Sequence, residues 1–475
     1  MLKAITILIV AAAVWGCSLA PRYQQPVAPV YPTYSDLAPE GTKDAASIDW
    51  HEFFADPQLK AYLAAALTNN RDLAASVARI EAARAQFRIQ NSQRLPQIGV
   101  TGDAARSRAP GGIPGGTSGP TTYSQYDVGV GVSSFELDFW GRVRNLSAAA
   151  RANYLSTVEA TRAFRLSLIG DVAATYLALR AGEERIALAE RTLGSRREGL
   201  AIARLRLDAG VTSTIDFDQS TTLVTQAETD LADLRRTTTR TANQLLVLVG
   251  GPMNSTLPPP RAIDDQGQFR SLDAGLPSAL LTNRPDIRQA EQALLAANAN
   301  IGAARAAYFP TISLTGNFGF ASSSLGDLFD DDSRAWRYGG TVGLPIFDWG
   351  QRSADVDRTK ALRDEAVANY QRTIQQAFRE VADGLAGRRY YADQIQAQAR
   401  AVAAQRRLAE TAHLRYDNGI SIYLEVLDAE RNLFNAEQQL ITLRSLELQN
   451  GVSLYVALGG GEQVTETAMP GQQRR

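Results

Sequence analysis

The chain has 475 residues, a formal net charge of −1 at pH 7, two histidines and one cysteine. A charge this close to neutral gives no electrostatic reason to expect nucleic-acid binding. So few histidines and cysteines exclude a zinc cluster and a disulfide framework.

The N-terminus has the organisation of a secretory signal. A short basic region, Met1–Lys3, precedes an apolar run from Ala4 to Val14, which is too short to cross a membrane as a helix. A small residue followed by Cys17 then resembles a bacterial lipoprotein cleavage and lipidation site. We expect a signal peptide over residues 1–16 and lipid on Cys17. The alternative is an ordinary secretory signal with an incidental cysteine.

Residues 17–49 are predicted to form an extended tether, because prolines recur among polar residues there. A helix is expected to follow, with Asp56 as its N-cap and Pro57 at its first position. Its Ala- and Arg-rich sequence predicts that it continues to about Ser92 and stops before Pro96.

Two strand-like segments come next. In each segment every second residue is apolar or small, and the residues between them are polar or small. The apolar or small positions are Ile98, Val100, Gly102 and Ala104 in the first segment and Tyr126, Val128, Val130 and Val132 in the second. Arg106–Thr122, rich in glycine and proline, is predicted to be the loop between them. The pair recurs at Ile312–Phe320 and Trp336–Leu344.

Each of these segments has about 9–11 residues, the length of a tilted membrane-crossing strand. Aromatic residues suited to a membrane interface are Tyr123, Tyr126, Trp336 and Tyr338. Alternation over about ten residues is a weak signal, so the edge of a soluble sandwich is the alternative. No other stretch is apolar enough for a membrane helix, so any crossing of a bilayer would use these strands.

Long helices are predicted after each strand pair. No proline occurs from Thr121 to Gly251 or from Ile346 to Met469. Apolar residues recur every seven positions from Val172 to Leu207 and from Leu427 to Tyr455, a repeat that imposes a left-handed supercoil. A helix over 142–208 would be about 100 Å long. Such an element predicts a tube or rod.

Two short motifs are predicted to end these helices. Asp208-Ala209-Gly210 and Asp417-Asn418-Gly419 each place glycine at a left-handed helix cap. Thr212–Thr214 and Ser421 can then cap the returning helices, expected at about 214–249 and 422–457. Each motif is therefore the tip of a helical hairpin, at the end farthest from the strands.

The chain is an internal duplication. An offset of 209 residues maps Leu205–Thr212 onto Leu414–Ser421 and Trp140-Gly141 onto Trp349-Gly350, and upstream the offset is 214. We divide the chain into repeat 1 (50–251), a linker (252–274), repeat 2 (275–461) and a disordered tail (462–475).

Four strands cannot close a membrane barrel, because the smallest known barrel has eight. Exposed strand edges are not viable in lipid. If the strands cross a bilayer, several chains must share one barrel, and their helices must share one tube.

The sequence resembles the TolC family of trimeric outer-membrane efflux channels, in its NodT-like lipoprotein branch. The similarity covers about residues 47–461. The segments that carry it, besides the two tips, are Trp50–Leu59, Gly275–Ser278, Arg284–Ile287 with Ala290-Glu291, Ile301–Arg305, Tyr308–Pro310 and Phe347–Gly350.

The resemblance implies an α+β membrane protein and a homotrimer. Three chains would share a twelve-stranded outer-membrane β-barrel, above a periplasmic α-barrel of coiled helical hairpins. Such a protein is a passive exit duct that carries drugs or other small molecules, works with a periplasmic adaptor and an inner-membrane pump of the resistance-nodulation-division type, and leaves substrate selection to the pump. It catalyses no reaction and needs no cofactor or metal beyond the lipid on Cys17. The expected location is the outer membrane of a Gram-negative bacterium, with lipid as a partner and no nucleic acid.

The same resemblance assigns adaptor docking to the two tips. The matching positions are Arg206, Asp208, Gly210, Val211 and Thr212 in the first tip, and Arg415, Asp417, Gly419, Ile420 and Ser421 in the second. The alternative is that the glycines only cap helices, which they must do in either case.

A periplasmic gate is expected just beyond the tips. The residues that align with the family's constriction are Asp216, Arg415, Tyr416, Leu424, Glu425 and Asp428. Leu424 and Asp428 share a helix face, so a ring of three chains would present a leucine ring and a carboxylate ring. Tyr416 or Arg415 is the expected partner of Asp216. The alternative is that these carboxylates are solvated groups near a helix N-terminus.

Two other functions compete with the duct. A lipid-anchored coiled-coil scaffold would explain the heptads and Cys17, but not matched strand pairs in each repeat. An enzyme lacks support, since the sequence has no nucleophile elbow and no Gly-rich phosphate loop.

Overall fold

The computed structural model describes residues 18–31, 43–110, 119–253, 256–266, 272–273, 281 and 283–461. The predicted signal peptide, Cys17 and the predicted tail lie outside these residues. Contacts divide the described chain into two compact units, each with parts of both repeats. The first unit holds residues 18–27, 79–110, 119–158 and 289–370, and the second holds the remainder.

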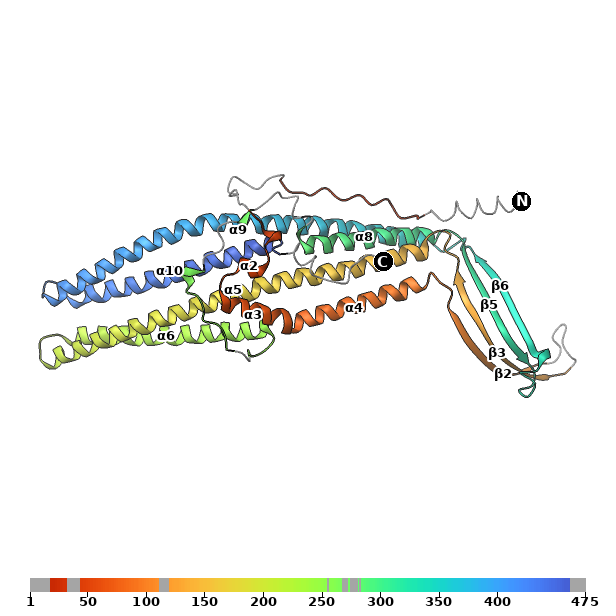
Figure 1. Cartoon of the computed structure of the whole chain (residues 1–475), viewed down its shortest axis with the longest axis horizontal. Helices are drawn as coiled ribbons and strands as arrows, with labels where there is room; N and C mark the ends of the chain where they lie inside the picture. The colour runs from red at the N-terminus through yellow and green to blue at the C-terminus, as the bar shows by residue number, and fades with distance from the viewer. Residues whose placement is uncertain are drawn as a thin grey trace. The chain divides into compact units, whose positions relative to one another are not determined.

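The first unit contains an antiparallel sheet of four strands. These are β2 (Ile98–Ala109), β3 (Thr121–Glu136), β5 (Thr311–Ser322) and β6 (Arg334–Gly343), in the order β2-β3-β5-β6 (Figure 1). The central pair joins the two repeats, with Val130 opposite Phe318. β2 and β6 are the edge strands, and nearly all their residues are exposed.

The predicted loop Arg106–Thr122 is too long at both ends. Pairing between β2 and β3 continues to Ala109 opposite Thr121. Arg106 and Arg108 continue β2 instead of beginning the loop. Strand pairing uses only their backbone groups, and their side chains are exposed to solvent. A short helix of the 3-10 type, η4 (Asp331–Ser333), precedes β6.

Helix α8 (Pro285–Ala306) packs against α5 (Arg142–Asp208) in this unit. Ala296 of α8 is buried with Ala149 and Ala152 in one cluster, where small side chains let helices approach closely.

The predicted tether is bound rather than free over residues 18–27. Ser18 donates a hydrogen bond to Asn145 at 2.8 Å, and Tyr23 donates one to Glu291 at 2.9 Å. Backbone oxygens of this segment accept bonds from Asn298 and Arg305. Residues 18–27 are extended and follow a defined path along the helices. The predicted tether is wrong over residues 43–47, because these form a strand and a helix of the 3-10 type in which Ala45 and Ala46 are buried.

In the second unit, α2 (Trp50–Phe53) and α3 (Pro57–Asn69) come first. Asp56 is the N-cap of α3 and Pro57 begins it, as predicted. The expected single helix to Ser92 is wrong, because Asn70 adopts an extended conformation (ψ 128°) between α3 and α4 (Arg71–Ser92). The Asn70 side chain accepts from the Leu73 amide at 2.8 Å and thereby caps α4.

Four long helices form the two hairpins. They are α5 (Arg142–Asp208), α6 (Thr214–Val249), α9 (Gln351–Asp417) and α10 (Tyr423–Ala457). These bounds agree closely with the predicted ones. The predicted N-cap Ser421 is wrong, since the N-cap of α10 is Ile422, and the N-cap Ser213 of α6 makes no side-chain capping bond.

The core of the first hairpin is narrow and apolar. Leu193 of α5 is buried with Val224 and Leu231 of α6, and Phe434 of α10 packs against the same cluster. Small residues among the heptads, such as Ala189, allow this close packing.

Short elements complete the second unit. β1 (Lys43–Asp44) pairs in parallel with β4 (Leu272–Asp273), and two helices of the 3-10 type, η1 (Ala45–Ser47) and η2 (Ile263–Asp265), lie near them in the sequence. Among the described helices, none combines the length and apolar character needed to cross a membrane.

Candidate functional site

Both hairpin tips close with the same backbone motif. Gly210 and Gly419 have φ angles of 69° and 71°, the left-handed conformation that the sequence predicted. In the first tip the Val211 amide donates to the Arg206 carbonyl at 2.9 Å, and in the second the Ile420 amide donates to the Arg415 carbonyl at 2.8 Å. These bonds define a Schellman cap in each repeat.

The tips carry exposed apolar side chains at matched positions. The three pairs related by the duplication are Leu205 and Leu414, Val211 and Ile420, and Ile215 and Leu424, and all six side chains are exposed. An apolar contact between the residue after the glycine and one in the last helical turn often accompanies a Schellman cap, which can account for Val211 with Leu205 and Ile420 with Leu414. Ile215 and Leu424 lie outside this motif. A paired apolar surface of this kind is typical of a contact site for another protein.

The polar residues predicted for docking have mixed surroundings. Asp208 lies 3.3 Å from Arg204 in an exposed ion pair, and Asp417 is exposed. Thr212 donates to Asp216 on the following turn. The Ser421 hydroxyl is buried and has no hydrogen-bond partner among the described residues, which leaves it with an unused donor.

The predicted partners of Asp216 are wrong within one chain. Its carboxylate accepts from Thr212, whereas the Tyr416 hydroxyl accepts from Arg206. Arg415 instead lies 3.9 Å from Glu425. The sequence could not show that Arg206 is the cation that reaches the tyrosine.

Arg206 joins the two hairpins. Its guanidinium lies 4.7 Å from the centre of the Tyr416 ring as well as donating to the hydroxyl. The Tyr416 ring is 4.9 Å from the Tyr423 ring, and a side-chain carbon added at Gly199 would come within 2.6 Å of the Tyr423 hydroxyl. We call Arg206, Tyr416, Tyr423 and Gly199 the tip clasp.

Gly199 and Tyr423 were not predicted as site residues, and Arg206 was assigned only to docking. One signal was available, because the tyrosine at 416 has only a leucine, Leu207, as its counterpart in repeat 1. Tyr423 likewise has the non-aromatic Thr214 as its counterpart, so both aromatic residues of this contact are present in repeat 2 alone. Burial is the main cause that raises the pKa of Tyr423, which keeps its hydroxyl neutral.

The remaining predicted gate residues lie on the first turns of α10. Asp428 forms a 2.9 Å ion pair with Arg431, and both Asp428 and Glu425 are about half exposed. Leu424 is 40% exposed. Within one chain these side chains are available to solvent or to another protein.

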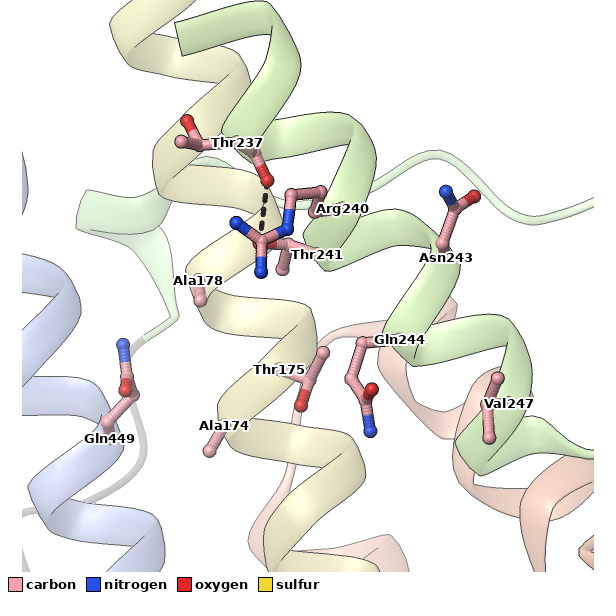
Figure 2. Close-up of a pocket in the computed structure, with 10 residues that line it drawn as sticks. All are labelled: Ala174, Thr175, Ala178, Thr237, Arg240, Thr241, Asn243, Gln244, Val247 and Gln449. Atoms are coloured by element: carbon pink, nitrogen blue, oxygen red, sulfur yellow. Dashed lines mark hydrogen bonds between the residues drawn. The ribbon is translucent and has the colours of Figure 1, made fainter. Parts of the chain in front are cut away.

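A separate groove lies along α5 and α6. Its volume is about 780 Å³, and Figure 2 shows that Thr175, Arg240, Thr241 and Gln244 border it. Gln449 of α10 lines it as well. Among the described residues, no group of histidine, cysteine and carboxylate side chains is placed to hold a metal ion.

Comparison with known families gives a clear match. The family model described as outer membrane efflux protein matches residues 62–251 and 276–460, one segment in each repeat.

Relatives and solved structures agree with this match. The chain is 43% identical over 422 residues to the solvent efflux pump outer membrane protein SrpC of Pseudomonas putida, covering 87% of this chain and 88% of that protein. It is 40% identical to the cation efflux system protein CusC of Escherichia coli over 424 residues, covering 88% and 90% of the two chains. The open-state structure of the MtrE outer membrane channel of Neisseria gonorrhoeae superimposes with a TM-score of 0.86 at 35% identity, covering 94% and 99%.

Proposed function

The chain belongs to the outer membrane efflux protein family, and from this membership we propose that it is the passive exit duct of a tripartite efflux system. In this proposal three copies assemble, each contributing four strands to a shared twelve-stranded barrel and two hairpins to a periplasmic tunnel. Relatives of this chain are outer-membrane channels of efflux pumps rather than enzymes.

The observation that carries the proposal is the open sheet. Its order leaves β2 and β6 unpaired on their outer edges, and neither edge is covered by another described strand. Edge strands this long are a hazard for aggregation unless another chain pairs with them. A ring of identical chains satisfies both edges of every copy.

Conductance tests this function directly. Protein purified from membranes and inserted into planar lipid bilayers should give stepwise currents. If neither the unchanged protein nor a variant that opens the proposed gate conducts ions, the duct is contradicted and the scaffold alternative is favoured.

The partners follow from the tips. We propose that a periplasmic adaptor docks on the exposed apolar pairs and on the polar positions beside them, and that the adaptor connects the duct to an inner-membrane pump of the resistance-nodulation-division type. Selection of the transported substrate belongs to the pump.

Cross-linking can test docking. A cysteine at Thr212 or Ser421 should cross-link to the adaptor in cells that make the whole pump. Thr229→Cys, on an exposed part of α6 beyond the tip, is the control that should stay uncross-linked. Active pumps without adducts from either tip cysteine would refute docking at this site.

The gate is proposed to lie at the tip clasp. Arg206 and Tyr416 link hairpin to hairpin through one charged hydrogen bond and one cation–π contact, together worth about 1–3 kcal/mol at a half-exposed site. That is weak enough for adaptor binding to break. Leu424, Glu425 and Asp428, repeated around the ring, would resist water and favour cations. Asp428→Ala should therefore reduce cation preference.

Cys17 is proposed to be the acylated mature N-terminus, and its lipid is the only non-protein group that the duct needs. The bound path of residues 18–27 supports an anchor held beside the first unit. Mass spectrometry of protein purified from membranes should find lipid on Cys17; an intact Met1, or cleavage with a free thiol, would contradict this assignment.

A further inference from the structure

Two tryptophans that the duplication relates have opposite surroundings. Trp140 follows β3, and its indole nitrogen donates to the Pro310 carbonyl at 2.9 Å. Its ring stacks on Phe309 at 4.6 Å between centres. Trp349 follows β6 at the matching position, yet 90% of it is exposed.

Trp349 belongs to a larger apolar surface. Leu344, Ile346 and Phe347 precede it, with exposed fractions of 51%, 89% and 72%. The ring centres of Phe347 and Trp349 are 4.5 Å apart, so the two rings form one patch. Several adjacent large apolar side chains exposed together mark an interaction surface.

The backbone at Trp349 adds a second observation. Its φ angle is 56°, and it is the only residue other than glycine with positive φ among the described residues. A bulky residue holds this conformation at a cost, and it persists where further contacts fix it. In the described chain the ring contact of Trp349 is to Phe347, which is itself exposed.

The duplication also identifies the missing surface. An offset of 214 residues relates Phe309 and Pro310 to Leu95 and Pro96. Leu95 is 68% exposed and Pro96 is exposed, and both precede β2 as Phe309 and Pro310 precede β5. The docking surface used once inside the chain is therefore present a second time and uncovered.

The two uncovered surfaces belong to opposite edges of the sheet. β3 and β5 are adjacent in the sheet, which brings Trp140 to Pro310. β2 and β6 are at opposite edges, separated by β3 and β5, so Trp349 cannot reach Pro96 through strand pairing within one chain. A second copy of the chain, with its β2 beside β6 of the first, recreates the arrangement found between β3 and β5.

We propose that Trp349 docks on Leu95 and Pro96 of the neighbouring copy, as Trp140 docks on Phe309 and Pro310 within one chain. The indole nitrogen donates to the Pro96 carbonyl, and the ring packs on Leu95. The Ile346 amide donates to the Ile98 carbonyl of the neighbour, matching the 2.8 Å bond from Leu137 to the Ile312 carbonyl. This inference rests on the proposed trimer and names the residues that set its strand register.

Thiol cross-linking tests the contact. Leu95→Cys and Trp349→Cys are combined in one chain and treated in membranes with a short bismaleimide. The proposal predicts covalent dimers and trimers. The matched control, Trp140→Cys with Phe309→Cys, should become linked within one chain, and the unchanged protein, whose one cysteine is Cys17, gives the background.

Mixed chains establish that the link is between copies. Co-expression of one tagged chain with Leu95→Cys and one differently tagged chain with Trp349→Cys should give a band that carries both tags. A link formed inside single chains, or no dimer where the control pair reacts, overturns the inference.

Native mass spectrometry and conductance measurements distinguish failure of this contact from failure of the proposed duct. A conducting trimer without the Leu95–Trp349 link rejects only the contact. A monomer that neither conducts nor cross-links rejects the proposed function together with the contact.

Discussion

Each helical hairpin has left-handed glycines at both ends, and the space around these glycines differs. At the tips, no described atom beyond the adjacent residues of the chain lies within 4 Å of a side-chain carbon added to Gly210 or Gly419. Where α6 and α10 end, a carbon added to Gly250 would lie 2.3 Å from the Asn69 carbonyl oxygen, and one added to Gly459 would lie 2.7 Å from that of Asn283. We call these two places the junctions.

The difference separates two uses of one local motif. At the tips glycine satisfies the backbone alone, and the space around it is open. At the junctions glycine also lets the helix end press against another segment of the chain, which builds the core. The junctions should therefore govern stability, and the tips should govern passage and docking.

The largest expected effect comes from filling a junction. Gly250→Ala adds backbone strain and a collision with a carbonyl, so it should lower the free energy of unfolding by about 3 kcal/mol or more. Gly210→Ala should cost about 1–2 kcal/mol, because only the left-handed conformation is penalised. Urea unfolding followed by circular dichroism measures both. Equal losses would show that the two regions do not differ as described.

The second prediction concerns a buried cation at the second junction. Arg284 is 8% exposed and bonds to Glu380 at 2.7 Å and to the Ala457 carbonyl at 3.0 Å. It also bonds to Asp286, again at 2.7 Å. Arg284→Ala should destabilise by about 2–3 kcal/mol in urea unfolding, since it leaves carboxylates without their partner.

Repeat 1 provides the control for this change. Asn70 stands where repeat 2 has Arg284, and it donates to the matching carbonyl, that of Leu248, at 2.8 Å. Asp171, the counterpart of Glu380, has a pKa raised by partial burial. Arg284→Asn should give a smaller loss than Arg284→Ala, because it reproduces the first junction; an equal loss would mean that the backbone bond contributes nothing.

The third prediction is a dependence on acid. Asp56 is fully buried, and burial alone would raise its pKa. Hydrogen bonds from Gln266, Tyr176 and the Arg261 and Gln58 amides outweigh burial and lower the pKa below its ordinary value. A depressed pKa means that Asp56 stabilises the fold above its ordinary pKa and that this contribution is lost as pH falls below about 4.

Asp56→Asn should therefore lose less stability between pH 6 and pH 3 than the unchanged protein does. At pH 6 the variant itself should be less stable than the unchanged protein by about 1–2 kcal/mol. Parallel stability curves for the two proteins would exclude a role for the Asp56 charge.

Local features were predictable from the sequence. Pro57 after Asp56, and Gly210 and Gly419 at the tips, fix helix ends through their own backbone preferences. Contacts between distant segments were not predictable. The break at Asn70, the binding of residues 18–27 and the bond from Arg206 to Tyr416 depend on how helices pack, which no local pattern encodes.

Family resemblance supplied the expected gate residues but not their partners within one chain. Tyr416 and Asp216 were both expected at the gate, but the partner of Tyr416 is Arg206 of the other hairpin, 210 positions away in the sequence. The exposed apolar pairs at the tips were visible only once side-chain burial was known. Sequence patterns therefore identify the region, and packing decides which side chains meet within it.

Single-channel conductance of a clasp variant tests the central claim that the open surface at the tips controls passage. Arg206→Ala removes the contact with Tyr416, whereas Arg204→Ala, two residues away, removes only a contact with Phe217 and an exposed ion pair with Asp208. In planar bilayers Arg206→Ala should raise the resting conductance several-fold, Tyr416→Phe should raise it less, and Arg204→Ala should match the unchanged protein. If all four proteins show the same resting conductance, the clasp does not hold the channel closed.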